Sequence, residues 1–381
     1  MRIIKRFFVV VGALVLLSSC SQLQTGQKKT TSVARVPTHR HAAVDAKRPI
    51  VSTVHPTTGK SAKVTNKSTN AASKSTQTTT TTPSKPPVHA QTGPTPLPTP
   101  AALTPFSGST PATWTPAGRL VNGTAAVYET TLVPPGGSQP AGIAWMDQNL
   151  LSARLYSGSG SPGGGPYQYT APIQPAQAAT LVAAFNGGFF MSSAHGGYYT
   201  QGKVIVPLVY GAASLVIYSN GDVNIGAWGT DVGMAPNVVG VRQNLVPLVA
   251  NGAPTPTAAS SNWQLWGVTC GLTSCASTVP GIENQWRSGV GITSNGALVY
   301  VQGPSLDPLQ LADLLVRAGA VRAMELDINP DWPIFASYNP TTPGGLASPA
   351  NGTKLLQTSV QGPWTFFEPW WARDFITMSA R

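Results

Sequence analysis

The sequence predicts an α+β domain, a mixed and mainly antiparallel β-sheet with a few covering helices. Three observations lead to this prediction. Two segments have the pattern of β-hairpins, one has the pattern of a capped amphipathic helix, and the same region is rich in glycine and tryptophan but poor in long helical patterns. We expect the domain to occupy residues 115–381, a length that supports one sizeable core.

The two hairpins are predicted at residues 213–229 and 289–303. Each is an apolar, strand-like segment interrupted by an Asn-Gly pair, at 220–221 and at 295–296. Asn-Gly is the strongest short-range signal for a type I′ turn, because both residues tolerate positive φ. Each segment should therefore form two antiparallel strands.

Residues 305–320 are predicted to form a helix. Asp307 is placed as the N-cap, Pro308 at the first helical position, Gln310 at the third and Gly319 as the stop. The buried face should consist of apolar residues three or four positions apart: Leu311, Leu314, Leu315 and Ala318.

The helix leads into residues 322–329, which carry an apolar residue at every second position and end before a proline. This alternation predicts a half-buried strand. Glu325 and Asp327 then share the other face, roughly 6.5–7 Å apart at their backbones, from which rotamers can bring the carboxyl groups into the ~5–9.5 Å range of glycosidase pairs. The alternative is a solvated strand face without a chemical role.

A second polar cluster lies in residues 183–199, AAFNGGFFMSSAHGGYY. Glycines let backbone amides approach a ligand closely, and an asparagine side chain both donates and accepts hydrogen bonds. One interpretation is a tight turn. The other is a lip that binds a sugar or an oxyanion, formed by Asn186, Gly187, Gly188, Phe190, His195 and Tyr198.

These segments resemble, in order, the motifs of the phosphodiester glycosidases. Residues 186–191 resemble the family's Asn-small-Gly-Phe-Phe motif, and residues 287–291 its Arg-Thr-Ala-small-Gly strand. Residues 326–327 coincide with the Leu-Asp of its Leu-Asp-Gly-Gly-Gly-Ser motif, and the first hairpin and the helix also fall in the family's order. The resemblance covers residues 180–335 and implies a glycoside hydrolase acting on a sugar-1-phosphodiester or a related cell-envelope glycan.

The chain departs from the family after Asp327, where residues 328–332, INPDW, replace the glycine run that can cradle an anion. The resemblance therefore does not identify the substrate. Bacterial relatives share the Leu-Asp-Ile-Asn form and an Arg-Gln-Asn-Leu segment like residues 242–245, which indicates a subfamily.

The resemblance implies roles for the charged residues. Glu325 and Asp327 are the expected acid/base or nucleophilic pair, which acts on an oxocarbenium-like transition state. Arg287 is the expected phosphate ligand and Arg242 the second choice, because a guanidinium binds phosphate in a bidentate way. The alternative for Arg287 is a structural ion pair with Glu283 or Asp327.

Asn186 completes the expected catalytic set, and Asn329 and Trp332 are expected to contact the substrate. A rival hypothesis from another class is a non-catalytic lipoprotein that binds wall glycans through aromatic side chains. Its binding residues would be Trp332, Trp263, Trp266 and Tyr198.

Residues 1–20 have the form of a secretory signal, with basic residues before an apolar run that is short for a membrane span. Leu17-Ser18-Ser19-Cys20 resembles a lipobox, so we expect Cys20 to be lipidated and the protein to be anchored on the extracellular face of the cell membrane. Without lipidation it would be secreted. Residues 21–114, rich in Thr, Ser, Pro and Lys, are expected to be a disordered linker.

The net charge of +11 is concentrated at the N-terminus. Residues 1–110 hold 14 Lys and Arg against one acid, a balance of +13, and residues 111–381 hold 10 against 12, a balance of −2. The domain is thus nearly neutral, which argues against nucleic-acid binding. Two interpretations of the basic linker are open, a plain spacer and a segment that contacts anionic wall polymers.

Cys270 and Cys275 bracket a short loop, and in an exported protein such a pair indicates a disulfide. A zinc site would need more ligands, but the domain has one histidine, His195. We therefore expect no metal, and no cofactor motif is present.

Overall fold

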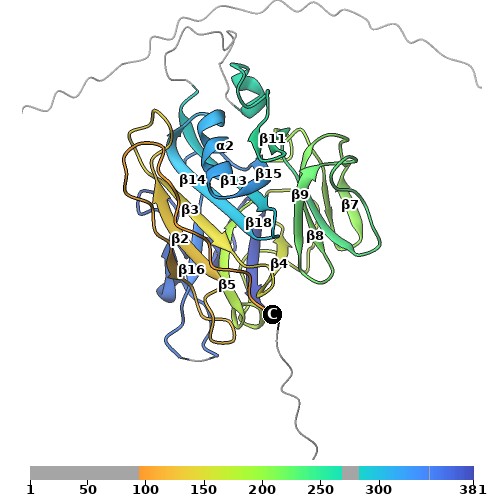
Figure 1. The fold of residues 1–381 in the computed structure, drawn as a ribbon. Coiled ribbons are helices and arrows are strands. Elements are labelled where there is room, and N and C mark those ends of the chain that lie inside the picture. The colour runs from red at the N-terminus through yellow and green to blue at the C-terminus, as the bar shows by residue number, and fades with distance from the viewer. Residues whose placement is uncertain (1–93, 268–282, 343) are drawn as a thin grey trace, which may run out of the picture. The chain divides into compact units, whose positions relative to one another are not determined.

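The structure is a computed structural model that describes residues 94–267, 283–342 and 344–381 (Figure 1). Cys20, Cys270 and Cys275, with the predicted lipid anchor and disulfide, lie outside the described residues. The described chain forms three antiparallel sheets within one compact unit.

The largest sheet has eight strands and carries the candidate carboxylates. In spatial order, its strands are β1 (Thr115–Ala117), β2 (Val127–Leu132), β3 (Ala141–Met146), β14 (Leu298–Leu306), β13 (Gln285–Thr293), β15 (Ala320–Glu325), β11 (Pro247–Ala250) and β12 (Ala253–Pro254).

The other two sheets have five strands each. One has the order β7 (Lys203–Val206), β6 (Tyr198–Thr200), β10 (Val238–Gln243), β8 (Ala213–Tyr218) and β9 (Val223–Ala227). The other has the order β17 (Gly352–Lys354), β16 (Phe335–Tyr338), β5 (Leu181–Asn186), β18 (Phe375–Ala380) and β4 (Leu151–Tyr156).

Helices are few in the described residues. They are α1 (Pro175–Ala178) and α2 (Pro308–Arg317), with 3₁₀ turns at Trp263–Trp266, Pro349–Asn351 and Thr365–Phe367. The α+β prediction therefore holds only in its coarse form, because the fold is mostly antiparallel sheet and α2 is the one helix longer than a single turn. None of the described helices is long and apolar enough to cross a membrane.

The predicted helix is confirmed as α2. Asp307 accepts a hydrogen bond from the Gln310 amide at 2.7 Å, and the Gln310 side chain accepts from the Asp307 amide at 3.0 Å, which completes a capping box. Gly319 follows with φ of 99°. The apolar face of α2 packs on the eight-stranded sheet, where Leu311 and Leu315 are fully buried.

Both predicted hairpins are confirmed, as β8–β9 and β13–β14. Their turns are not type I′, because within each Asn-Gly pair only the glycine has positive φ, 85° at Gly221 and 89° at Gly296. The amide of Gly221 donates to the Tyr218 carbonyl, and that of Gly296 to the Thr293 carbonyl. Each loop is thus three residues long and ends in a glycine in the left-handed conformation.

Strand β15 is buried on both faces, so the predicted solvent face is wrong. Met324 belongs to the core between the three sheets, whereas Ala323 belongs to the core beneath α2. Glu325 and Asp327 are fully buried as well. Alternation alone misses this burial, because the polar face is covered by arginines from other segments.

The folded region begins before residue 115. Residues 94–114, which we expected within the linker, pack on the domain: Leu103 is buried, Leu97 and Phe106 contact the core beneath α2, and the Leu97 amide donates to Asp147 at 2.8 Å. Their proline-rich composition resembles a linker, but these few apolar side chains are enough to hold the segment against the sheet.

Candidate active site

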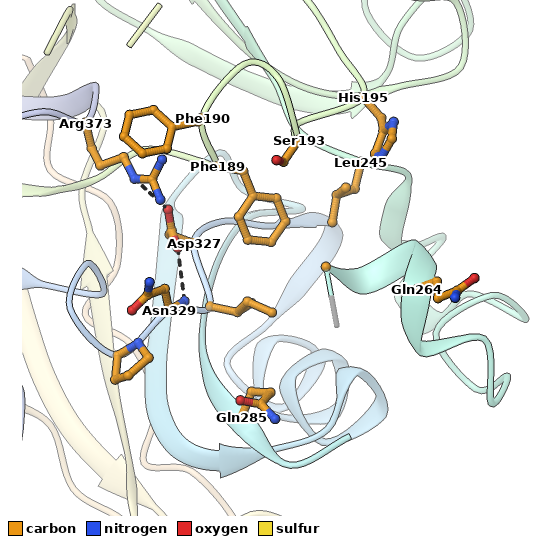
Figure 2. A pocket seen from close by; sticks show the side chains of 13 residues that line it. Phe189, Phe190, Ser193, His195, Leu245, Gln264, Gln285, Asp327, Asn329 and Arg373 are labelled. Carbon is orange, nitrogen blue, oxygen red and sulfur yellow. Dashed lines mark hydrogen bonds and ion pairs between the residues drawn. The ribbon is translucent and has the colours of Figure 1, made fainter. Parts of the chain in front are cut away.

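A cavity of about 510 Å³ opens beside the end of β15, and Figure 2 shows the side chains around it. Loops after β5 and β15 and the residue two positions before β18 form much of its wall. Among the lining residues, Asp327 is the one carboxylate and Arg373 the one arginine. The cavity thus has a charged pair at its wall and aromatic side chains beside it.

The backbone at the end of β15 fixes Asp327 at this wall. Strand β15 ends at Glu325, but the Leu326 amide still donates to the Ser288 carbonyl at 2.7 Å. Both the amide and the hydroxyl of Ser288 donate to the Asp327 carbonyl, at 3.1 and 2.8 Å. The Asp327 side chain accepts from the Asn329 amide at 3.0 Å, so the turn that follows also orients the carboxylate.

Asp327 and Arg373 form an ion pair, with Oδ2 of Asp327 3.1 Å from Nε of Arg373. The two atoms lack the alignment of a hydrogen bond, and Nη1 of Arg373 has no partner among the described residues. The guanidinium lies 3.5 Å from the centre of the Phe190 ring and 4.6 Å from that of Trp332. It is therefore held by aromatic faces and keeps donors available for a ligand.

Burial raises the pKa of Asp327 to about 6, although Arg373 and the Asn329 amide favour the charged form. Burial likewise lowers the pKa of Arg373, which still carries its charge. A carboxylate that titrates near neutrality and lines a cavity has the properties of a reacting group.

Glu325 and Arg287 form a second ion pair, which is sealed from the cavity. Nη1 of Arg287 donates to Oε2 of Glu325 at 2.7 Å, and both side chains are fully buried. The other donors of Arg287 go to backbone carbonyls, those of Leu306, Trp266 and Glu283. Neither Arg287 nor Glu325 lines the cavity.

This arrangement does not fit the expectation that Arg287 binds the phosphate of the substrate. Four N–H groups of Arg287 already have partners, so the structural alternative fits better, although its partner is Glu325 rather than the Glu283 or Asp327 side chain. Burial raises the pKa of Glu325 to about 7 against the opposing effect of Arg287, and Oε1 of Glu325 has no partner among the described residues.

A third ion pair, between Arg242 and Asp374, supports the Asn-Gly-Gly-Phe-Phe loop at residues 186–190. Nε of Arg242 donates to Asp374 at 2.8 Å, and Nη2 donates to the Phe189 carbonyl. The side chain of Asn244 accepts from the Phe189 amide at 3.0 Å and donates to the Glu325 carbonyl at 2.9 Å. Arg242 is thus fully buried and has a structural role here.

The two glycines of this loop make room for that third pair. A Cβ on Gly187 would lie 2.1 Å from Oδ2 of Asp374, and a Cβ on Gly188 would lie 2.5 Å from Oδ1 of Asn244. The Gly187 amide donates to the Asp374 carbonyl at 2.8 Å. The close approach is therefore to protein side chains rather than to a ligand.

The remaining predicted residues divide between the cavity and the core. Phe190, His195 and Asn329, which were expected to contact the substrate, line the cavity. Tyr198 is fully buried with its hydroxyl 3.1 Å from that of Ser157, so its expected place in the lip is wrong. Trp332 contacts Arg373 without lining the cavity.

Asn186 is fully buried and serves as a hub between sheets. Its Nδ2 donates to Ser288 at 3.0 Å, and its Oδ1 accepts from the Tyr300 hydroxyl at 2.7 Å and from the Ile334 amide at 3.1 Å. Asn186 therefore acts on the site through Ser288, which holds the Asp327 backbone.

Sequence reasoning missed Arg373 and Asp374. They lie in the segment WWARDF at residues 370–375, far beyond the motifs that carry the family resemblance. The one available signal was an adjacent Arg-Asp pair next to tryptophans in a domain with few charges. Asn244, within the Arg-Gln-Asn-Leu segment, was noticed only as part of a motif.

In the described residues, no group of His, Cys, Asp and Glu is arranged to hold a metal ion. Among the described residues, the cavity wall offers one carboxylate, one cation and aromatic surfaces.

Comparison with known proteins shows what the central part of the chain is similar to. A model of the phosphodiester glycosidase family matches residues 179–327, a segment that ends at Asp327. The resemblance seen in the motifs is thereby confirmed over this range. No curated protein sequence matches the chain.

Several solved structures are similar to the chain. The zebrafish N-acetylglucosamine-1-phosphodiester alpha-N-acetylglucosaminidase catalytic domain, auto-inhibited by its pro-peptide, is 16% identical with a TM-score of 0.41, over 72% of this chain and 90% of that one. A hypothetical protein from Synechocystis is 14% identical with a TM-score of 0.35, over 72% and 64%. A putative exported protein from Burkholderia pseudomallei K96243 is 13% identical with a TM-score of 0.23, over 69% and 56%.

Proposed function

From the phosphodiester glycosidase match over residues 179–327, we propose that the chain is a hydrolase that cleaves a sugar-1-phosphodiester or a related cell-envelope glycan. The observation that carries the proposal is the Asp327–Arg373 pair at the wall of the 510 Å³ cavity. A carboxylate and a cation side by side are what this reaction needs, the first near the sugar C1 and the second near the phosphate.

In the proposed reaction the C1–O bond breaks and its electron pair leaves with the phosphate. Arg373 exchanges Asp327 for a phosphate oxygen and so stabilises the leaving group. Asp327, as carboxylate, stabilises the positive charge that develops at C1, either by charge alone or by a covalent bond. Water then adds its hydroxyl to C1 and gives up a proton, and the products are the free sugar and a phosphate monoester.

This proposal changes two of the expected roles. Arg373 replaces Arg287 as the phosphate ligand, because Arg373 lines the cavity and Arg287 does not. Glu325 lies behind the cavity wall, where its ion pair with Arg287 supports the fold instead of contacting the substrate. Phosphate is a good leaving group, so a strong general acid is not required.

We also propose that the enzyme works at the cell envelope, anchored through a lipid on Cys20. The support is the signal-like sequence of residues 1–20 and its Leu-Ser-Ser-Cys ending. Cys20→Ala should release the protein from the membrane fraction or leave the signal uncleaved. Unchanged membrane partition with normal processing would contradict the anchor.

The activity is tested by incubating the full-length protein with sugar-1-phosphodiesters, teichoic-acid fragments and para-nitrophenyl sugars. When the substrate is a sugar-1-phosphodiester, we expect equal amounts of a reducing sugar and a phosphate monoester as products. Saturable binding of a glycan without any turnover would instead support the non-catalytic wall-binding alternative.

A further inference from the structure

A second groove runs between the edge strand β4 and the sheet that contains β6, β8 and β10. It consists of two cavities, of about 460 and 380 Å³, that share Thr200 and Gln201 in their walls. Each cavity falls in the ~300–1,000 Å³ range of small-molecule sites. The groove has no lining residue in common with the cavity that contains Asp327.

Among the described residues, the groove contains the two cations that have no polar partner. Arg154 lines one cavity and Lys203 the other, both are exposed, and neither forms an ion pair or a side-chain hydrogen bond within the described residues. Every other lysine and arginine in that part of the chain donates a hydrogen bond or forms an ion pair: Arg119, Arg242, Arg287, Arg317, Arg322, Lys354, Arg373 and Arg381.

The charge around these two cations is positive, since none of the described residues that line the two cavities is an Asp or Glu. This is unusual in a region whose balance over residues 111–381 is −2. An anion that entered the groove would meet two cations without displacing a carboxylate. Such a site favours a negatively charged ligand.

The other lining groups suit sugars. The Tyr169 ring contacts two side chains. The Arg154 guanidinium lies 4.0 Å from the centre of this ring, and the centre of the Tyr156 ring lies 5.7 Å from it. Tyr167 and Tyr218 also line the groove. Tyrosine rings offer apolar faces for the C–H side of a sugar and hydroxyls for its polar edge. Side-chain amides and hydroxyls add hydrogen-bonding groups: Gln168, Gln201, Ser152, Thr200 and Ser219.

One loop connects this groove with the candidate active site. Residues 157–172 supply Tyr167 and Tyr169 to the groove. Near the start of the same loop, the amides of Gly160 and Ser161 donate to the Ala372 carbonyl, at 3.1 and 2.9 Å, next to Arg373. A glycan chain in the groove would therefore contact the segment that also supports the pocket wall.

We propose that this groove binds an anionic glycan chain, with sugar faces on the tyrosines and phosphate or carboxylate groups on Arg154 and Lys203. It is a site for holding polymer, separate from the one that reacts. The inference does not depend on the proposed catalytic activity.

The test measures binding of the full-length protein to three polymers, poly(glycerol phosphate), polygalacturonate and neutral dextran, at fixed ionic strength. The wild-type protein should bind at least one anionic polymer and bind dextran at least tenfold more weakly. The anionic polymer that binds with the higher affinity shows whether the groove prefers phosphate or carboxylate groups. Equal affinity for dextran would overturn the proposal.

A matched pair of variants separates the groove from the basic N-terminal region. Arg154→Gln/Lys203→Gln should lower affinity for the anionic polymer about tenfold or more, as expected for the loss of two charge-assisted contacts. Lys28→Gln/Lys29→Gln removes the same charge outside the groove and should change affinity less than twofold. Equal losses in both variants would assign binding to the N-terminal region and overturn the proposal.

Two further measurements guard against a folding defect. Arg154→Lys keeps the charge and should retain most of the affinity, and Tyr169→Ala should weaken binding while the two cations remain. If the protein hydrolyses a small soluble phosphodiester, all these variants should do so at the wild-type rate. A parallel loss of turnover and binding in Arg154→Gln/Lys203→Gln would show damage to the fold and contradict a separate site.

Discussion

Glu325 and Asp327 lie two positions apart at the end of one strand, and each meets one arginine. Around Glu325 the partner Arg287 is enclosed by backbone carbonyls, and both side chains are fully buried. Around Asp327 the partner Arg373 lies on aromatic rings at a cavity wall and keeps a free donor. A carboxylate and a guanidinium thus form a structural ion pair at Glu325 and a pair available to a ligand at Asp327. The two pairs differ because only the second lies at the cavity wall.

The largest expected effect concerns the sealed pair. Arg287→Gln leaves Glu325 buried without its cation, and breaking one partner of a buried pair typically costs about 3–5 kcal/mol of unfolding free energy. Thermal or denaturant unfolding of the full-length protein measures this loss. An unchanged Tm would show that Arg287 does not support the fold and would reopen its role as a substrate ligand.

The next effect concerns the Asp327–Arg373 pair at the cavity wall. Arg373→Gln should lower kcat/KM on a sugar-1-phosphodiester by roughly 10- to 100-fold, because one or two charge-assisted hydrogen bonds to phosphate are lost. The loss on a neutral aryl glycoside should be much smaller. Arg373→Lys is the control, since it keeps the charge. Equal losses on both substrates would contradict phosphate binding by Arg373.

A smaller effect is expected from pH. Because the pKa of Asp327 is raised to about 6 and the proposed reaction uses its carboxylate, kcat/KM should fall about tenfold per unit as pH drops below 6. A pH profile measured between 4.5 and 8, on an enzyme shown to stay folded, tests this. A rate that is constant down to pH 4.5 would show that Asp327 is not the titrating group.

For the buried Glu325–Arg287 pair, we expect pH to change the stability of the protein rather than kcat/KM. The pKa of Glu325 is raised in the fold to about 7, so the folded state binds more protons than the unfolded state between the ordinary value of 4.5 and about 7. The contribution of Glu325 to stability is thus complete below about pH 4.5 and is lost as pH rises through 7. Comparing the Tm of the wild-type protein and Glu325→Gln across this range isolates the contribution, and identical pH profiles would contradict it.

Local sequence signals were sufficient for several elements. The capping box and terminal glycine placed α2, and the Asn-Gly pairs placed both hairpins, because caps and turns are decided by neighbouring residues. The turn type was missed, since the choice between a two- and a three-residue loop depends on the pairing register of the strands.

Long-range partners could not be read from the sequence. Glu325 and Asp327 were identified as the key carboxylates, but their different environments depend on Arg287, 38 positions away from Glu325, and on Arg373 near the C-terminus. Burial of the polar face of β15 follows from these contacts. Spacing along a strand predicts which side chains share a face, but not what covers that face.

The central claim is that Asp327 reacts and Glu325 supports. It is tested most directly by measuring kcat/KM on one sugar-1-phosphodiester for Asp327→Asn and Glu325→Gln in parallel, with the Tm of each. We predict that Asp327→Asn loses about 10²- to 10⁴-fold in kcat/KM with its fold intact, whereas Glu325→Gln retains activity within about tenfold of the wild type and differs mainly in stability. A large loss in Glu325→Gln together with an active Asp327→Asn would contradict the account and make the sealed carboxylate the reacting one.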